Sequence, residues 1–443
     1  MLFDELSVQK FHIRVLIAGA CGIFTDGYVL GSISPALPSL TSALHLSPHQ
    51  TGLVASAPLA GLLFGSLLAS PILDKIGRRI PFEFDMMSFV FLAFLHALTS
   101  DLTSLLILRF IIGCVLGVDY VAGKLYVSEF LPSAFRGKLM SWLSVAWVGG
   151  YTSAYAIGYV IHLVWPQGTW KIIFMSAAFP ALCAAILRYG MPESILWLLA
   201  RRRIGDARRV ADRYFGAVKL PSWSSDTQST GRSGTLRRVV ELFSGQQWRR
   251  SIGATLFYVL HNVPYLVLSA FLPEVLRNVG LHDPFKSGLF YDALLFSGAV
   301  TGLWIVERFQ RRALIVGSFV LQGSCLFIVS LFALPPLMTL LLLTAFGFIL
   351  TAADCLTYVY PPEVFPTDLR ATGVSLMVSS SRLVATLSTM AFPAAIAEYG
   401  LSASLAAIAV LLFAGAVICG FWASETQGKK LSTLGAKNAN SRS

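Results

Sequence analysis

Long apolar runs alternate with short polar segments along the whole chain. Each run approaches the roughly 20 residues that an α-helix needs to cross a bilayer. The runs are continuously apolar, whereas strands of a membrane barrel would alternate apolar and polar positions. Because backbone groups in lipid must be hydrogen-bonded within the segment, the pattern predicts an all-α integral membrane protein with twelve transmembrane helices. The expected spans are 13–37, 51–73, 80–99, 103–127, 138–162, 170–190, 249–275, 284–306, 312–333, 335–360, 370–397 and 401–422.

The twelve runs fall into two groups of six, separated by a polar and basic segment. We expect an N-terminal six-helix bundle (1–190), a cytoplasmic loop (191–248), a C-terminal six-helix bundle (249–422) and a cytoplasmic tail (423–443). Within the loop, Arg201–Phe215 is predicted to form a basic helix that lies along the membrane surface.

Charge is scarce and lies mainly between the apolar runs. Charged residues make up 13% of the chain, about half of the roughly 25% typical of soluble domains. The net charge is +11, and its Lys and Arg residues gather in alternate loops, as the positive-inside rule requires. The distribution predicts that both termini and the central loop are cytoplasmic, and it accounts for the basic character without nucleic-acid binding. The six cysteines lie in apolar runs without metal-ligand spacing, so no metal site is expected.

The two halves repeat the same charged motifs at the predicted cytoplasmic ends of their helices. Asp74–Arg79 reappears as Glu307–Arg312, displaced by 233 residues. Glu129–Pro132 reappears as Glu363–Pro366, displaced by 234. Acids beside arginines can form pairs that hold helix ends together in one state and release them in another; the alternative is that they only orient the chain and snorkel to the surface. The predicted gating network is Asp74, Arg78, Arg79, Glu129, Arg136, Glu193, Glu307, Arg311, Arg312, Glu363, Arg370 and Glu425.

These motifs resemble those of the major facilitator superfamily over nearly the whole chain. Gly65–Arg79 is similar to the signature loop of the superfamily, and Arg109–Gly113 with Ser128–Gly137 is similar to its sugar-porter pattern. Asp26–Tyr28 and Gly117–Tyr120 are closer to its bacterial metabolite:proton symporters. The resemblance implies a monomeric transporter of the bacterial inner membrane that works by alternating access and uses the proton as coupling ion, without a cofactor.

The chain departs from the superfamily pattern at three places. Gln310 stands where the first half has Gly77, and Ile195-Leu196 replaces the usual Pro-Arg, which removes one charge from the cytoplasmic network. The glutamine-rich pattern of hexose carriers is missing from the seventh span, which weakens a sugar assignment.

An ionisable residue inside a membrane span is costly and marks a functional site. Asp26 lies midway along the first span and Arg109 in the fourth, and the resemblance implies that this pair belongs to the proton-coupling site. The alternatives are a static ion pair between the two spans and a direct contact with substrate. Asp119, on another face of the fourth span, is the third proton-coupling candidate.

Cations deep in both halves predict a cavity that favours an anion such as a carboxylate. Lys124 either lines this cavity or snorkels to the surface, and Arg382 either binds substrate or is neutralised by Asp354. Aromatic residues at interior positions can stack on a ring or simply pack, and His261 lies beside Asn262 near a helix-breaking proline. The predicted substrate-binding residues are Tyr28, Tyr120, Lys124, Trp147, Tyr151, Tyr258, His261, Asn262, Asp354, Tyr358 and Arg382.

No nucleotide-binding or hydrolytic motif accompanies these features, so the sequence favours a secondary transporter over an enzyme. We expect proton-coupled symport of a small organic metabolite, such as an organic anion. The alternatives are a sugar or polyol symporter, proton-antiport efflux of a small molecule, and a non-transporting membrane sensor. The expected partners are the small-molecule substrate and the lipid bilayer.

Overall fold

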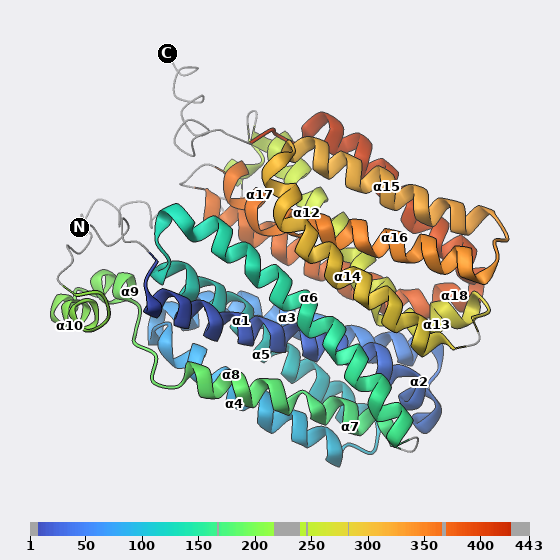
Figure 1. Ribbon diagram of the computed structural model, residues 1–443, viewed down its shortest axis with the longest axis horizontal. Helices are drawn as coiled ribbons and strands as arrows, with labels where there is room; N and C mark the ends of the chain where they lie inside the picture. The colour runs from blue at the N-terminus through green and yellow to red at the C-terminus, as the bar shows by residue number, and fades with distance from the viewer. Residues whose placement is uncertain are drawn as a thin grey trace. The chain divides into compact units, whose positions relative to one another are not determined.

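The structure is a computed structural model that describes residues 8–165, 168–216, 240–244, 247–281, 283–365 and 369–426. In these ranges the regular secondary structure is helical (Figure 1). Contacts divide the chain into two compact units, residues 1–46 with 53–227 and residues 47–52 with 228–443.

The helices of the first half are α1 (Lys10–Gly31), α2 (Ile33–Leu44), α3 (Pro48–Ile76), α4 (Arg79–Leu95), α5 (Leu102–Phe130), α6 (Ser133–Val164), α7 (Thr169–Ser176), α8 (Ala178–Arg188), α9 (Ile195–Ala200) and α10 (Ile204–Phe215), with a 3₁₀ turn at His96–Leu98. Those of the second half are α12 (Gln247–Ala270), α13 (Leu272–Asn278), α14 (Pro284–Arg308), α15 (Arg311–Leu331), α16 (Pro336–Asp354), α17 (Leu356–Val364) and α18 (Arg370–Trp422).

The number of membrane spans follows from helix length and from the breaks between helices. Ten helical segments of the described chain are long and apolar enough to cross a bilayer. The last of these contains two spans, because Gly400 adopts φ 82° and interrupts the helical backbone. Helix α6, with 32 residues, adds one more. The described residues therefore contain twelve spans, and the prediction of a twelve-helix all-α membrane fold is confirmed.

In the first unit, α1 packs against α6, α8 and α5, and α4 lies beside α8 and α5 (Figure 1). In the second unit, α12 and α15 both pack on α18, and α14 packs on α16. Large apolar side chains that do not enter these contacts point outward, for example Phe91, which is 64% exposed, and Trp304, which is 67% exposed. Such surfaces suit a lipid environment, in which apolar side chains need no further burial.

The predicted basic helix after the sixth span is also present, although it begins at Ile204 rather than Arg201. One face of α10 is buried through Ala207, Ala211 and Phe215. The Phe215 ring lies 5.4 Å from the ring of Phe11, so α10 is fixed against the start of α1. This packing positions the arginines of α10 beside the start of α4.

Candidate functional site

The centre of the first unit holds a buried guanidinium between carboxylates. Arg188, at the end of α8, donates to the Oδ1 atom of Asp119 on α5 at 2.7 Å and to Oδ1 of Asp85 on α4 at 2.9 Å. It also donates to the carbonyl oxygens of Ala18 at 3.3 Å and Phe82 at 3.1 Å. Arg188 and Asp119 are fully buried. The arginine therefore ties α8 to α1, α4 and α5.

Asp26 on α1 completes this cluster. Its side chain is fully buried near Asp119, Arg188 and Asp85, and neither of its carboxylate oxygens has a hydrogen-bond partner among the described residues. Three ionised carboxylates around one guanidinium would leave uncompensated charge in a buried site, which is expensive. The cluster approaches charge balance only when it holds protons, so its composition suits a group that binds and releases them.

A glycine on α1 makes room for the guanidinium. A Cβ atom at Gly22 would lie 1.5 Å from the Nη2 atom of Arg188. Gly22 precedes Asp26 by four residues, so the two positions lie on the same face of the helix. One face of α1 thus provides both the space for the Arg188 guanidinium, at Gly22, and an acid, Asp26.

The structure does not bring the predicted pair of Asp26 and Arg109 together. Arg109 is buried with its guanidinium 4.6 Å from the centre of the Phe174 ring. Among the described residues no carboxylate lies within ion-pair distance of Arg109. The reason is depth: Asp119, which faces Asp26, lies ten residues further along α5, or about 15 Å at 1.5 Å per residue.

Two members of the cluster, Asp85 and Arg188, were not among the candidates from sequence. Both lie within predicted spans, but near their ends, where an ionisable side chain is easily interpreted as snorkelling. The signal that identifies Asp26 and Asp119, an ionisable residue in an apolar run, applies to them equally.

The candidate substrate residues of the first unit make contacts within that unit. The hydroxyl of Tyr28 forms a hydrogen bond with Ser176 Oγ at 2.8 Å, and Trp147 stacks on Tyr151 with ring centres 5.7 Å apart. Lys124 Nζ lies 3.4 Å from the centre of the Tyr120 ring, a cation–π contact with a half-buried lysine.

In the second unit, His261 and Asp354 form a polar pair. The Nε2 atom of His261 on α12 lies 3.3 Å from Oδ1 of Asp354 on α16, which links these two helices. Arg382 is buried on α18, at 3% exposure. Asn262 donates to the carbonyl of Tyr258 at 2.8 Å, and Tyr358 is half-buried. The repeat therefore has different polar interiors in its two halves.

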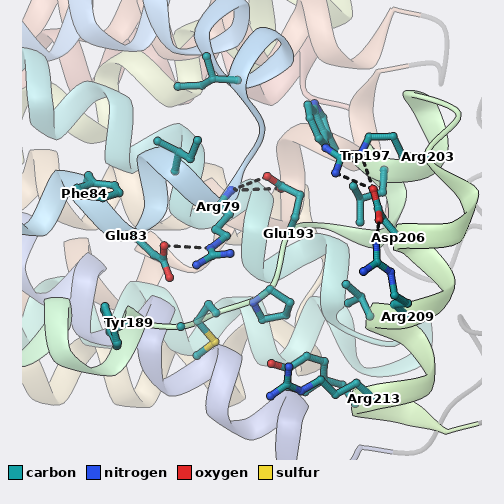
Figure 2. A pocket seen from close by; sticks show the side chains of 18 residues that line it. Arg79, Glu83, Phe84, Tyr189, Glu193, Trp197, Arg203, Asp206, Arg209 and Arg213 are labelled. Carbon is teal, nitrogen blue, oxygen red and sulfur yellow. Dashed lines mark hydrogen bonds and ion pairs between the residues drawn. The ribbon is translucent and has the colours of Figure 1, made fainter.

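The repeated motifs form matching networks at corresponding ends of both halves. In the first, Arg78 Nε lies 3.4 Å from Oε1 of Glu129 and Nη1 lies 3.1 Å from Oδ1 of Asp74. Glu193 accepts the backbone N–H group of Arg78 at 2.9 Å. It also accepts that of Arg79 at 3.2 Å (Figure 2), and both bonds cap the start of α4.

In the second half, Arg311 Nε lies 3.5 Å from Oε2 of Glu363. Glu425 accepts the backbone N–H groups of Arg311 and Arg312, each at 3.1 Å. The structure thus pairs corresponding residues of the repeat in the same way. The side chains of Arg136 and Arg370, which were also assigned to the gating network, lie outside the described residues, and Glu307 ends α14 beside Arg308.

Buried tyrosines extend this correspondence beyond the charged motifs. The hydroxyl of Tyr126 donates to the carbonyl of Pro192 at 2.6 Å, and the hydroxyl of Tyr360 accepts the N–H of Ser424 at 3.0 Å. The two tyrosines are 234 residues apart, the same displacement as Glu129 and Glu363. Neither was singled out from sequence, because a tyrosine in an apolar span gives no signal of its own.

Within the described residues, no group of three or more His, Cys, Asp or Glu side chains is arranged to hold a metal ion. The buried polar groups described above are carboxylates and guanidinium groups in the first unit and a His–Asp pair with a buried arginine in the second. Such a set can bind protons and compensate the charge of an anion.

Comparison with known proteins agrees with the helical repeat and its motifs. The family described as "Sugar (and other) transporter" matches residues 15–436. The chain belongs to this family of the major facilitator superfamily and is a multi-pass membrane transporter. It is 35% identical to the inner membrane metabolite transport protein YgcS of Escherichia coli, over 98% of this chain and 96% of that protein.

More distant relatives also match over nearly the whole chain. The niacin transporter NiaP of Acinetobacter baylyi is 25% identical, over 98% of both chains. The solved structure of the xylose transporter XylE from E. coli, in a partially occluded inward-open conformation, has a TM-score of 0.78. It is 20% identical and covers 95% of this chain and 100% of that one, which shows a shared fold.

Proposed function

We propose that this transporter is a proton-coupled symporter of a small organic anion in the bacterial inner membrane, with cytoplasmic termini. The observation that carries the proposal is the buried cluster of Asp26, Asp85 and Asp119 around Arg188. Asp85 and Asp119 bond to the guanidinium, which also donates to two backbone carbonyls, and Asp26 is buried beside them with no hydrogen-bond partner among the described residues. A purely structural ion pair requires one carboxylate per guanidinium, whereas this cluster has an excess of acids.

The cluster supplies a local mechanism for coupling. When Asp26 releases its proton, its new charge competes with Asp119 and Asp85 for the five N–H donors of Arg188. When Asp26 binds a proton, the guanidinium returns to the other two acids. Because these acids lie on α1, α4 and α5, the protonation state of one side chain changes the forces among three membrane helices.

Buried cations support an anionic substrate. The Arg109 guanidinium has no carboxylate within ion-pair distance among the described residues, and a buried arginine gains most from a partner that carries two acceptor oxygens. Lys124 and Arg382 add positive charge in the first and second half. The relative NiaP is a niacin transporter, and niacin is a small aromatic carboxylate, which agrees with this charge. We therefore place Arg109 at the substrate anion rather than in the coupling pair with Asp26.

Uptake into proteoliposomes tests the substrate class. Labelled nicotinate and labelled xylose are offered with an inward proton gradient. We expect accumulation of nicotinate or competition by it, collapse of uptake when an ionophore removes the gradient, and no accumulation of xylose. Gradient-driven accumulation of xylose with no effect of carboxylates would favour the sugar or polyol alternative instead.

The substitution Asp26→Asn tests the coupling. Asparagine resembles the protonated acid but cannot release a proton, so gradient-driven accumulation should be lost while exchange of substrate across the membrane persists. Asp292→Asn is the matched control, since Asp292 is a buried acid of the second unit at 3% exposure. Accumulation at the wild-type level in Asp26→Asn would contradict the assignment and direct attention to Asp119.

A further inference from the structure

A cavity of about 870 Å³ opens at the end of the first unit where α4 begins (Figure 2). It lies between the start of α4, the segment 189–198 and α10. Its lining has a basic part formed by Arg79, Arg203, Arg209 and Arg213, here called the basic wall, and an apolar part, here called the apolar wall. The apolar wall comprises Ile76, Ile80, Phe84 and Tyr189.

Two arginines of the basic wall belong to α10, and the packing of this helix holds them in place. Arg209 and Arg213 are four residues apart and share one face of the helix, while Ala207, Ala211 and Phe215 bury the other. Figure 2 shows both arginines on the helical ribbon of α10, beside the cavity. Since the buried face cannot rotate without exposing Phe215, these two charges are fixed beside the cavity.

The carboxylates that line the cavity already have partners. Glu83 pairs with Arg79 Nε at 3.0 Å, and Glu193 accepts backbone N–H groups of the α4 terminus. Asp206 accepts from Arg203 at 2.6 Å and from Arg209, and these bonds hold the pKa of Asp206 below its ordinary value, so it stays ionised at neutral pH.

Arg213 is the exception. In the described part of the chain no carboxylate lies within ion-pair distance of it, and its guanidinium lies 5.7 Å from the centre of the Tyr214 ring. Four arginines face three carboxylates in the lining, and the side chain of Arg209 remains 82% exposed despite its ion pair. The cavity therefore has an excess positive charge that is accessible to a ligand.

The apolar wall continues along the membrane-facing surface of the first unit. Phe84 and Phe91 are each 64% exposed on α4, and Ile186 is 67% exposed on the neighbouring α8. Helix spacing places Ile80, Phe84, Met87, Phe91 and Phe94 in one stripe. A soluble anion would use only the basic wall, whereas an amphipathic anion would use the wall and the stripe together.

We propose that this cavity binds an anionic phospholipid, with the headgroup phosphate at Arg209 and Arg213 and the acyl chains along α4 and α8. Guanidinium groups are well suited to phosphate because they donate two parallel hydrogen bonds. The bound lipid would hold α10 at the membrane surface. This site is separate from the Arg188 cluster and does not depend on the transported substrate.

Lipid binding to the purified full-length protein tests the site, with native mass spectrometry as the measurement. Phosphatidylglycerol, phosphatidylethanolamine and soluble glycerol 3-phosphate are compared. We expect preferential retention of phosphatidylglycerol, and a loss of about fivefold in its affinity in Arg213→Gln, the effect typical of one basic residue at a lipid surface. Arg208→Gln removes the same charge from the same helix at a residue that does not line the cavity, and it should leave the affinity unchanged.

Phe84→Ser tests the apolar wall at an exposed position that folding does not require. It should weaken phosphatidylglycerol binding. Equal losses in Arg213→Gln and Arg208→Gln would overturn the site in favour of general surface charge. Binding of glycerol 3-phosphate as strong as that of phosphatidylglycerol, or no preference over phosphatidylethanolamine, would also overturn it.

Discussion

At the scale of single residues, the informative feature is which buried arginine forms ion pairs with the buried aspartates. Arg188 contacts two carboxylates at 2.7 and 2.9 Å, whereas Arg109 lies against an aromatic ring. The two buried guanidinium groups of the first unit therefore have separate roles in the proposed mechanism. In that proposal, Arg188 affects proton binding by the acids, and Arg109 binds the substrate anion.

Substitution of each arginine separates these roles. Removing the Arg188 guanidinium withdraws a positive charge from the acids, so they hold protons to higher pH. The pH profile of uptake should move upward by about one unit or more, since a charge at this distance acts with several kcal/mol even at an effective dielectric of about 20. Arg109→Gln should raise the substrate KM without moving the pH profile.

Removing one partner of a buried ion pair destabilises a protein by roughly 3–5 kcal/mol, so Arg188→Gln can also affect folding. Arg188→Lys keeps the positive charge and is therefore measured beside it. Recovery of the wild-type pH profile in Arg188→Lys is expected. If the pH profile of uptake moved upward in Arg109→Gln and did not move in Arg188→Gln, the result would favour the original prediction that Asp26 pairs with Arg109.

At the scale of elements, the turn between the second and third spans of each half has a different backbone conformation in the two halves. Gly77, between α3 and α4, has φ 101°, and a Cβ atom there would lie 2.2 Å from an oxygen of Glu193. Gln310, at the corresponding connection, has φ −59° and an ordinary extended backbone. The second motif can therefore carry glutamine at this position, because its turn does not require a residue in the left-handed backbone region.

This difference gives a matched pair of substitutions. Gly77→Ala should destabilise the protein by at least about 1–2 kcal/mol, the usual cost of a left-handed non-glycine residue, and should lower the melting temperature by several degrees. Gln310→Ala should have little effect, because its backbone is accessible to any residue. The measurement is the melting temperature of each purified variant. Equal melting temperatures would contradict the prediction and would show that the turn at Gly77 can adopt another backbone conformation.

At the scale of the whole molecule, the networks around Glu129 and Glu363 are expected to bias the alternating-access equilibrium. Each acid pairs with an arginine of its own half, at 3.4 Å for Arg78 and 3.5 Å for Arg311. Charge pairs that persist in only one state stabilise that state by their differential interaction energy. The gating role assigned from the sequence stays a prediction.

Neutralising either acid tests this bias. Glu129→Gln and Glu363→Gln should increase the inward-open population, by about tenfold for each 1.4 kcal/mol of lost differential stabilisation. Distances between spin labels on the cytoplasmic helix ends measure the populations. Glu274→Gln is the control, because Glu274 is a 48% exposed acid paired within its own helix. Unchanged distributions in both test variants would leave these residues as orientation signals.

Most of the architecture could be predicted from the chain. Apolar runs determine membrane helices because lipid leaves the backbone no other partner than its own segment. The charged motifs repeat at displacements of 233 and 234 residues, so the sequence alone predicted that Arg78 corresponds to Arg311 and Glu129 to Glu363. The break at Gly400 inside one long helical stretch was anticipated as the boundary between the last two spans.

The sequence by itself determined the fold class, the two-fold repeat and the presence of buried ionisable residues, since each depends on local composition or on comparison of the chain with itself. Only the tertiary structure decided which of these residues meet. Asp26 could face either Asp119 or Arg109 on the same helix, and the choice depends on how far α1 and α5 slide past each other along their axes. Arg188 enters the cluster because Gly22 leaves space for it on a different helix. Neither the axial offset nor a space filled from a neighbouring helix is encoded in any local pattern.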